Sequence, residues 1–274
     1  MNINKYYNKS AKAYIIIGVI QLSLALILLY FYLTANDSET ALDLLFSMIM
    51  CFIGGTAFFI FGIAQRKWSK TKFRKNNLSS NEEDFFQASR LMLIPYVHWL
   101  REYEYFSLNG NSVARIREDV EGWRKFITFF LHLIGLRHFL KKSFIVENGE
   151  KTLFYLEKSR GFTQYFEIFN ADKVLIASYK MNIFNPVKQY AVIHDEKGNI
   201  IGKNDGGFSA QNFKVINNNG DKVIELKYQG IPMEAMETFS GTNGDIVDFN
   251  FHVLPEREVP KFILAPVIIQ LHFR

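Results

Sequence analysis

Six histidines and a few serine and acidic residues are the side chains that could bind a metal or carry out catalysis in this sequence. The histidines show no H-E-x-x-H or comparable helical spacing; they are His98, His132, His138, His194, His252 and His272. Ser209 lacks the closing glycine of a nucleophile elbow. Glu102 and Glu104 have the spacing of one strand face and form no evident acid–base pair. We therefore expect a non-enzymatic protein without catalytic residues, metal or cofactor.

Two glycine-containing stretches resemble ligand loops but lack essential parts. The stretch Asp205–Gly207 has no following lysine motif of a phosphate loop and is interpreted as a hairpin turn. The stretch Asp195–Asn199 is too short for an EF-hand and has no closing glutamate. It is predicted to be a solvated turn.

A run of basic residues after the second long apolar segment could bind anionic lipid headgroups. It consists of Arg66, Lys67, Lys70, Lys72, Arg74 and Lys75. Each such side chain contributes about 1 kcal/mol near an anionic surface. The alternative is that these residues only fix the orientation of the chain across a membrane, and both effects can operate together.

A second candidate for lipid contact is an amphipathic helix predicted at about 120–136. Its apolar face includes Trp123, Phe126, Ile127 and Phe130, and its other face carries Arg124 and Lys125. Such a helix can lie in the membrane interface, with its basic side chains at the headgroups. The alternative is that its apolar face covers the core of the neighbouring domain.

These candidates depend on a membrane hairpin predicted within residues 1–75. Two segments, about 13–36 and 44–65, contain no formally charged side chain, and each exceeds the roughly 20 residues that a helix needs to cross a bilayer. The only cysteine, Cys51, lies in the second segment, so no intramolecular disulfide can form. Gly54 and Gly55 also lie there; we interpret them as tolerated flexibility rather than as a close helix contact.

Charge on either side of the segments predicts their orientation. Lysines precede the first segment, the basic run follows the second, and the loop between them carries Asp37 and Glu39. The positive-inside rule then places both termini in the cytoplasm of a multi-pass cell-membrane protein. If the first segment were a cleaved signal instead, the part after Arg66 would still be cytoplasmic.

A polar linker is predicted at 76–89, and the pattern of residues 90–274 predicts an antiparallel β domain. Short β-prone runs alternate with turn signals such as Asn109-Gly110, Asn148-Gly149 and Asn219-Gly220. About twelve runs are counted between Tyr103 and Val253, the last of them alternating through Phe249, Phe251 and Val253. Twelve strands are enough for a closed barrel with a hollow interior.

The C-terminal tail is predicted to fill that hollow. Residues 260–273 form an apolar run too short to span a bilayer, so we expect a central hydrophobic helix. Pro266 lacks a backbone donor and is expected to kink this helix; an extended buried terminus is the alternative.

Residues 90–274 contain two notable stretches, Tyr190–Gly202 (YAVIHDEKGNIIG) and Asp248–Leu254 (DFNFHVL), and the apolar tail follows the second. On these stretches, this part of the chain resembles the tubby-like C-terminal superfamily. The similarity is to its phospholipid scramblase and LURP-one-related branch, with two added transmembrane helices. It implies a twelve-stranded barrel around a hydrophobic C-terminal helix. The segment that corresponds to the acidic stretch of scramblases, Leu254–Pro260, has two carboxylates and two prolines, so calcium dependence is not expected.

The expected function is that of a membrane-anchored module that binds lipid headgroups, with anionic phospholipid as the expected lipid, or an unidentified protein partner. Lipid translocation like that of scramblases is the alternative. Nucleic acid is not an expected partner, because the soluble part has no strongly basic face with interleaved aromatic residues.

Overall fold

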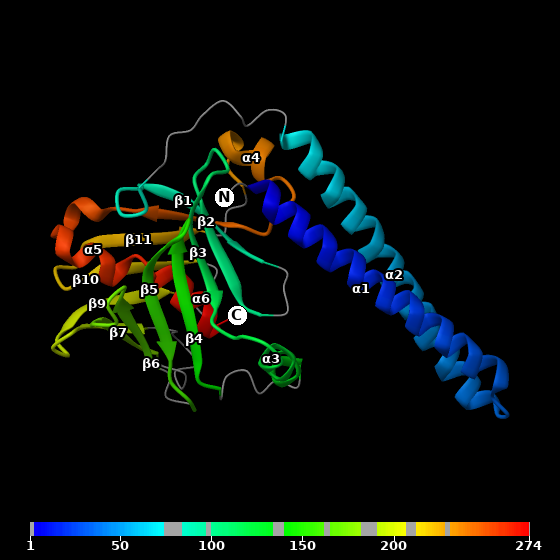
Figure 1. Cartoon of the computed structure of the whole chain (residues 1–274). Helices are drawn as coiled ribbons and strands as arrows, with labels where there is room; N and C mark the ends of the chain where they lie inside the picture. Colours follow the sequence, from blue (N-terminus) through cyan, green and yellow to red (C-terminus); the bar gives the residue numbers. More distant parts are fainter. Residues whose placement is uncertain are drawn as a thin grey trace. The chain divides into compact units, whose positions relative to one another are not determined.

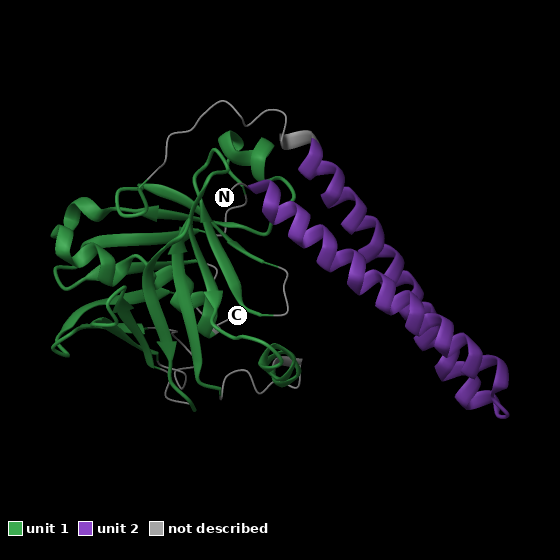
Figure 2. Cartoon of the chain, viewed as in Figure 1, with its two compact units in different colours: residues 1, 80–274 green, residues 2–79 purple. Residues whose placement is uncertain are grey.

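The computed structural model describes residues 3–73, 84–96, 100–133, 140–161, 165–181, 191–206, 212–227 and 231–273. The chain divides into two compact units, Asn2–Ser79 and Ser80–Arg274 with Met1 (Figure 2). The boundary lies within the predicted linker, whose residues 76–83 fall outside the described residues. Its remaining residues, 84–89, belong to the second unit, where Phe85 is fully buried in the core.

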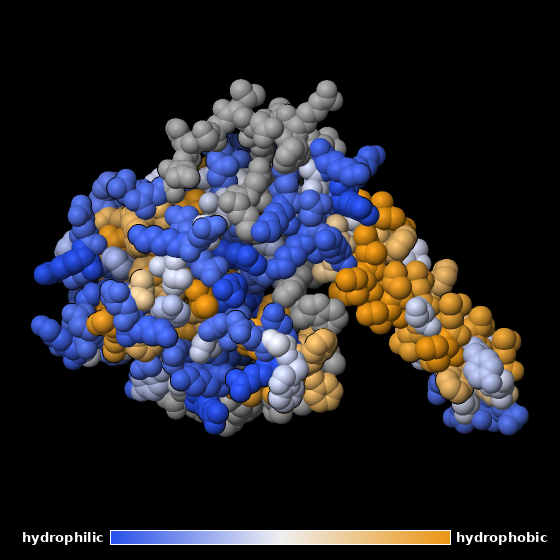
Figure 3. Space-filling model, in the orientation of Figure 1, coloured by the Kyte–Doolittle hydropathy of each residue, from blue (hydrophilic) through white to orange (hydrophobic). Residues whose placement is uncertain are grey.

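The first unit is a hairpin of two long helices, α1 (Ile3–Thr34) and α2 (Ser38–Phe73) (Figure 1). Both are long and apolar enough to cross a membrane. Asp37 caps α2, because its Oδ1 accepts a hydrogen bond from the backbone N–H of Thr40 at 2.8 Å. Apolar side chains cover much of the visible hairpin surface (Figure 3). Leu26 on α1 and Phe46 on α2, for example, are each 68% exposed. This surface is what a lipid-facing helix pair requires.

Glycines bring the two helices close together. A Cβ atom on Gly55 would lie 3.0 Å from the backbone nitrogen of Leu22, and one on Gly18 would lie 2.8 Å from that of Phe59. Small residues allow this approach in membrane helix pairs. The interpretation of Gly55 as merely tolerated flexibility was therefore wrong, because it lies at a backbone contact.

The second unit is a closed antiparallel barrel of twelve strands, as predicted. Each strand pairs with its neighbours along the chain, and β1 closes the ring by pairing with both β2 and β12. The strands are β1 (Arg90–Pro95), β2 (Glu102–Phe106), β3 (Ser112–Glu118), β4 (Lys142–Asn148), β5 (Lys151–Lys158), β6 (Tyr165–Asn170), β7 (Leu175–Met181), β8 (Ala191–Asp195), β9 (Ile200–Gly206), β10 (Phe213–Asn217), β11 (Lys222–Lys227) and β12 (Asp245–Phe249).

The C-terminal tail fills the barrel, which confirms the predicted central helix. It forms α5 (Val259–Phe262) and α6 (Ala265–Phe273), and residues 262–270 are all buried. Two inward tyrosines hold its entry: the Tyr179 hydroxyl lies 2.6 Å from the carbonyl oxygen of Lys261, and that of Tyr105 lies 3.4 Å from the carbonyl oxygen of Ile263. Deeper inside, the Gln270 amide donates to Asp245 at 2.7 Å.

Pro266 does not kink a continuous helix. The helix is interrupted at Ile263–Leu264, and Pro266 is the second residue of α6. A proline is tolerated there because the first-turn N–H groups have no intrahelical acceptor.

Three other local predictions were wrong. The twelve strands include β1 before Tyr103, so the range Tyr103–Val253, in which about twelve runs were counted, holds β2 to β12, and the last strand ends at Phe249. Residues Phe251–Val253 form a 3-10 turn, η2, instead of continuing the strand; a second 3-10 turn, η3 (Glu256–Glu258), follows it. Asp205 and Gly206 lie within β9 rather than in a turn.

A short helix, α4 (Met233–Phe239), was not predicted. It packs on the outer wall of the barrel, where the rings of Phe239 and Phe106 lie 6.1 Å apart and Glu234 lies 3.7 Å from Arg90.

Candidate membrane-contact site

The candidate site is the helix α3 (Arg124–Leu133), which lies between β3 and β4. The helix begins at Arg124 rather than at the predicted 120, because Trp123 belongs to the preceding turn. The predicted end of the helix, residues 134–136, lies outside the described residues. Gly122 opens that turn with φ of +57°, a conformation that favours glycine. The Phe126 N–H then bonds to the carbonyl of Trp123 at 3.1 Å.

The apolar side chains of α3 face solvent. The exposed fractions are 71% for Trp123, 77% for Phe126, 43% for Ile127 and 59% for Phe130. Fully burying one such side chain is worth about 1.5–3 kcal/mol. Together the four form a large apolar surface that the described residues of this unit leave exposed. The alternative prediction, that this face covers the barrel core, was wrong, because these four side chains are exposed.

Basic side chains flank the exposed apolar face. Arg124 and Lys125 are both exposed at the start of α3. An amphipathic helix with aromatic residues on one face and basic residues beside them has the composition of an interfacial membrane helix. The segment around α3 therefore carries both contributions, apolar burial and charge, that such contact uses.

The predicted basic run lies in the other unit. Arg66, Lys67 and Lys70 are exposed near the end of α2, as a headgroup-facing cluster requires. The side chains of Lys72, Arg74 and Lys75 lie outside the described residues.

A buried ion pair holds the base of α3. The ammonium of Lys142, the first residue of β4, lies 3.4 Å from the carboxylate of Glu118, the last residue of β3. Their side chains are 7% and 1% exposed. The Glu118 carboxylate also accepts the backbone N–H of Arg101 at 3.2 Å. The chain thus leaves the barrel for α3 and returns to it at two residues joined by a buried ion pair.

A second buried lysine lies beside this pair. Lys158 on β5 is the cross-strand partner of Lys142, and its side chain points into the barrel. Burial, together with the neighbouring charge of Lys142, lowers the pKa of Lys158 to about 8. The sequence analysis missed this cluster, although Glu118, Lys142 and Lys158 each fall on the apolar side of an alternating strand.

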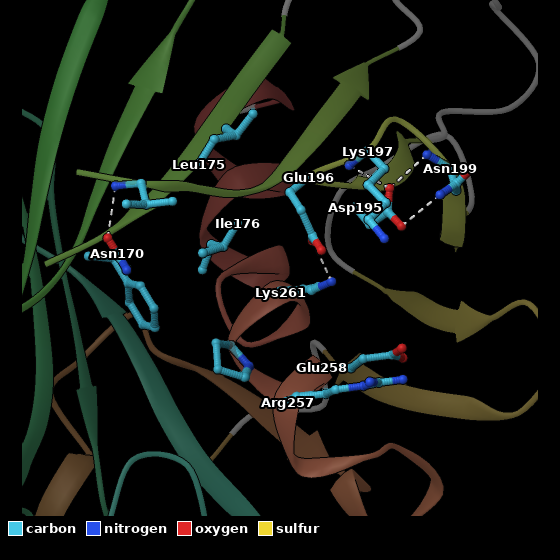
Figure 4. Close-up of a pocket in the computed structure, with 13 residues that line it drawn as sticks. Asn170, Leu175, Ile176, Asp195, Glu196, Lys197, Asn199, Arg257, Glu258 and Lys261 are labelled. Atoms are coloured by element: carbon cyan, nitrogen blue, oxygen red, sulfur yellow. Dashed lines mark hydrogen bonds and ion pairs between the residues drawn. The ribbon is translucent and has the colours of Figure 1, made fainter. Parts of the chain in front are cut away.

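The opposite end of the barrel contains a cavity of about 630 Å³ (Figure 4). It lies between the β6–β7 turn, the β8–β9 turn and the entry of the C-terminal segment. Lys261 reaches Glu196 at 2.7 Å across it, and this hydrogen bond lowers the pKa of the Glu196 carboxyl. Acidic and basic side chains occur in equal number in its lining, so its charge favours neither anions nor cations: Asp195, Glu196 and Glu258 against Lys197, Arg257 and Lys261.

The predicted solvated turn at Asp195–Asn199 forms part of this cavity. Asp195 Oδ1 accepts the backbone N–H groups of Lys197 and Asn199 at 2.9 and 2.7 Å. The carboxylate therefore stabilises its own turn. Within the described residues, no group of three or more His, Cys, Asp and Glu side chains is arranged to hold a metal ion.

The remaining acidic candidates support the barrel wall. Tyr103 and Tyr105 point into the core, so Glu102 and Glu104 share the outer face of β2, as their spacing predicts. Glu102 lies 2.6 Å from Arg115, and Glu104 accepts hydrogen bonds from Ser112 and Tyr96. Ser209 and His98 lie outside the described residues.

No family model, curated protein or solved structure matches this chain.

Proposed function

We propose that this protein is a membrane-anchored, non-enzymatic module of the tubby-like type, whose barrel contacts anionic lipid headgroups at the cytoplasmic face. The observation that carries the proposal is the solvent-facing apolar surface of α3, with Arg124 and Lys125 beside it. Two helices capable of spanning a membrane provide the anchor. The closed twelve-stranded barrel around a C-terminal helix supports the tubby-like part of the proposal.

Tethering makes weak contact sufficient. A domain held near a surface by its own anchor experiences a high effective concentration of that surface. A few buried aromatic side chains and two basic residues can then hold the barrel against the bilayer, although the same contacts would bind a free domain only weakly.

The test uses the second unit, residues 80–274, purified without the hairpin and checked for folding by circular dichroism. It is sedimented with vesicles of neutral or anionic phospholipid at low and high salt. We expect binding to anionic vesicles that weakens with salt, because the charge contribution is screened. Replacing Phe126 and Phe130 with Ser should lower binding at every salt concentration, whereas replacing Arg124 and Lys125 with Gln should mainly remove the salt dependence.

A matched control separates lipid contact from general apolar stickiness. Met233 on α4 is 88% exposed and is replaced with Ser in the same fragment. The Met233→Ser fragment should bind vesicles as well as the unaltered fragment does. A folded fragment that binds neither kind of vesicle would contradict the proposal and leave the exposed face of α3 to a protein partner. Lipid translocation stays a separate prediction, to be tested with fluorescent lipid in proteoliposomes of the full chain.

A further inference from the structure

We infer that the barrel docks end-on to the bilayer, with its α3 end toward the lipid and its opposite end, which bears the cavity beside Lys261, facing the cytoplasm. The α3 end is the rim where β3 ends and β4 begins, at Glu118 and Lys142. The turn end is the opposite rim, where tight turns join β2–β3, β4–β5, β6–β7, β8–β9 and β10–β11. The inference rests on the proposed lipid contact and adds its direction.

The two ends differ in the side chains that they expose. Four exposed apolar side chains occur together around α3 at one rim. The turn end instead exposes polar residues at the tips of its turns; they are Asn109, Glu150, Asp172, Lys197 and Asn219. Val174 and Ile200 are also exposed there, each directly after a separate turn, and Met233 and Met236 are exposed on the short helix α4, whose Glu234 lies 3.7 Å from Arg90 at this rim. Unlike the face of α3, these four include no aromatic side chain. Apolar burial in a bilayer therefore favours the α3 end.

The point where β3 leads into α3 is fixed by contacts within the barrel. The Glu118–Lys142 pair is buried, and beside it the Asp119 N–H bonds to the carbonyl of Ser143 at 2.7 Å, which extends the β3–β4 ladder toward the helix. On the β3 side only residues 119–123 separate Glu118 from α3, and a helix joined to a paired strand by so short a connection has less freedom than one on a long loop. Insertion of α3 would therefore constrain the direction of β3 relative to the bilayer.

The tether permits this orientation. The chain enters the barrel at the turn end, since Arg90 begins β1 opposite Asp248 near the end of β12. Eleven residue steps separate Phe73 from Asp84 and reach at most about 40 Å. Strands of five to eight residues are at most about 27 Å long. The connecting segment is therefore long enough to pass the full height of the barrel while the α3 end faces the membrane.

The test measures the depth of single residues in the full chain. Cys51 is the only cysteine, so a Cys51→Ser background accepts one new cysteine at a chosen position. An environment-sensitive fluorophore is attached at Phe126→Cys on α3, or at Asp172→Cys or Asn219→Cys at the turn end. Leu26→Cys in the first apolar helix is the positive control. Each protein is placed in nanodiscs of phosphatidylcholine and phosphatidylserine, with or without lipids that carry a nitroxide quencher on the acyl chain.

Quenching of about two-fold or more at positions 26 and 126, without quenching at 172 and 219, would support end-on docking, since an interfacial helix lies about 5–10 Å into the headgroup–acyl boundary. Equal quenching at 126 and at either turn-end position would overturn the orientation but leave the proposed lipid contact intact. Quenching at position 26 alone would overturn both. If the unlabelled Phe126→Cys protein forms a disulfide between two copies under oxidising conditions, and the labelled protein shows no quenching there, the α3 face belongs to a second copy of the chain and the inference is overturned.

Discussion

The Glu118 carboxylate and the Lys142 ammonium lie 3.4 Å apart at the two points where the chain leaves the barrel for α3 and rejoins it. The residues are 24 positions apart in the sequence (142 − 118), yet their side chains meet because β3 and β4 are adjacent strands. The pair is thus buried inside the barrel, and it joins the two ends of the segment that we propose to contact lipid.

Removing one partner of this pair should be costly. In Lys142→Ala the Glu118 carboxylate stays buried without its closest cation, so we expect a loss of about 3–5 kcal/mol in the free energy of unfolding. The measurement is denaturant unfolding of the full chain in detergent, followed by tryptophan fluorescence. The adjacent Lys141 is the matched control: its pair with Glu157 at 2.7 Å is solvent-exposed, and Lys141→Ala should cost about 0–1 kcal/mol. Equal losses in the two variants would contradict a buried role for Lys142.

Lys158 should make stability depend on pH in the alkaline range. Its pKa falls from an ordinary value of 10.5 to about 8 on folding. Between these values the unfolded chain binds the proton more tightly, so the free energy of unfolding should rise with pH by about 1–3 kcal/mol after allowance for solvent screening. Below pH 8 the penalty is complete and the contribution of this group is flat.

The measurement for Lys158 compares the unaltered chain with Lys158→Met over pH 7 to 11. The neutral methionine has no such penalty, so its advantage over the unaltered chain should be largest below pH 8 and shrink toward pH 10.5. A difference that stays constant over this range would show that Lys158 is not the titrating group.

The hairpin makes a separate prediction about Gly55. A methyl group there would meet the backbone of Leu22 at 3.0 Å and the carbonyl oxygen of Gly18 at 3.1 Å, so the helices must move apart. We expect Gly55→Ala to lower the free energy of unfolding in detergent by about 1–3 kcal/mol. At Gly54 the nearest atom is the flexible side-chain oxygen of Gln21, and Gly54→Ala should be close to neutral. The reverse order of the two variants would argue against this helix pairing.

Much of the barrel was predictable because its signals are local. Turns such as Asn219-Gly220 are encoded by adjacent residues, and Gly220 adopts φ of +86° as this type of turn requires. Alternation along strands such as Phe213–Asn217 then fixes which face is inward. The central helix followed from length, because an apolar run too short for a membrane needs cover within the protein.

What escaped prediction depends on contacts between distant residues. Whether the apolar face of α3 is buried or exposed cannot be decided by its periodicity, which is the same in both cases. Glu118, Lys142 and Lys158 looked like ordinary charged residues at strand ends until the closed barrel placed them together. The helix α4 is seven residues long and rests on Phe106, so local propensity alone gives it little support.

The entry of the C-terminal segment gives the last prediction. The Tyr179 hydroxyl donates to the carbonyl of Lys261 at 2.6 Å, where the tail enters the barrel. Tyr179→Phe keeps the ring but leaves that carbonyl without this donor, so we expect a loss of about 1–2 kcal/mol in the free energy of unfolding. Tyr105→Phe is the control, because its hydroxyl lies 3.4 Å from the carbonyl of Ile263 and forms a weaker bond. Hydrogen exchange of the Lys261–Leu264 amides should rise in Tyr179→Phe more than in Tyr105→Phe if this bond fixes the entry; equal protection in both would show that packing alone holds the tail.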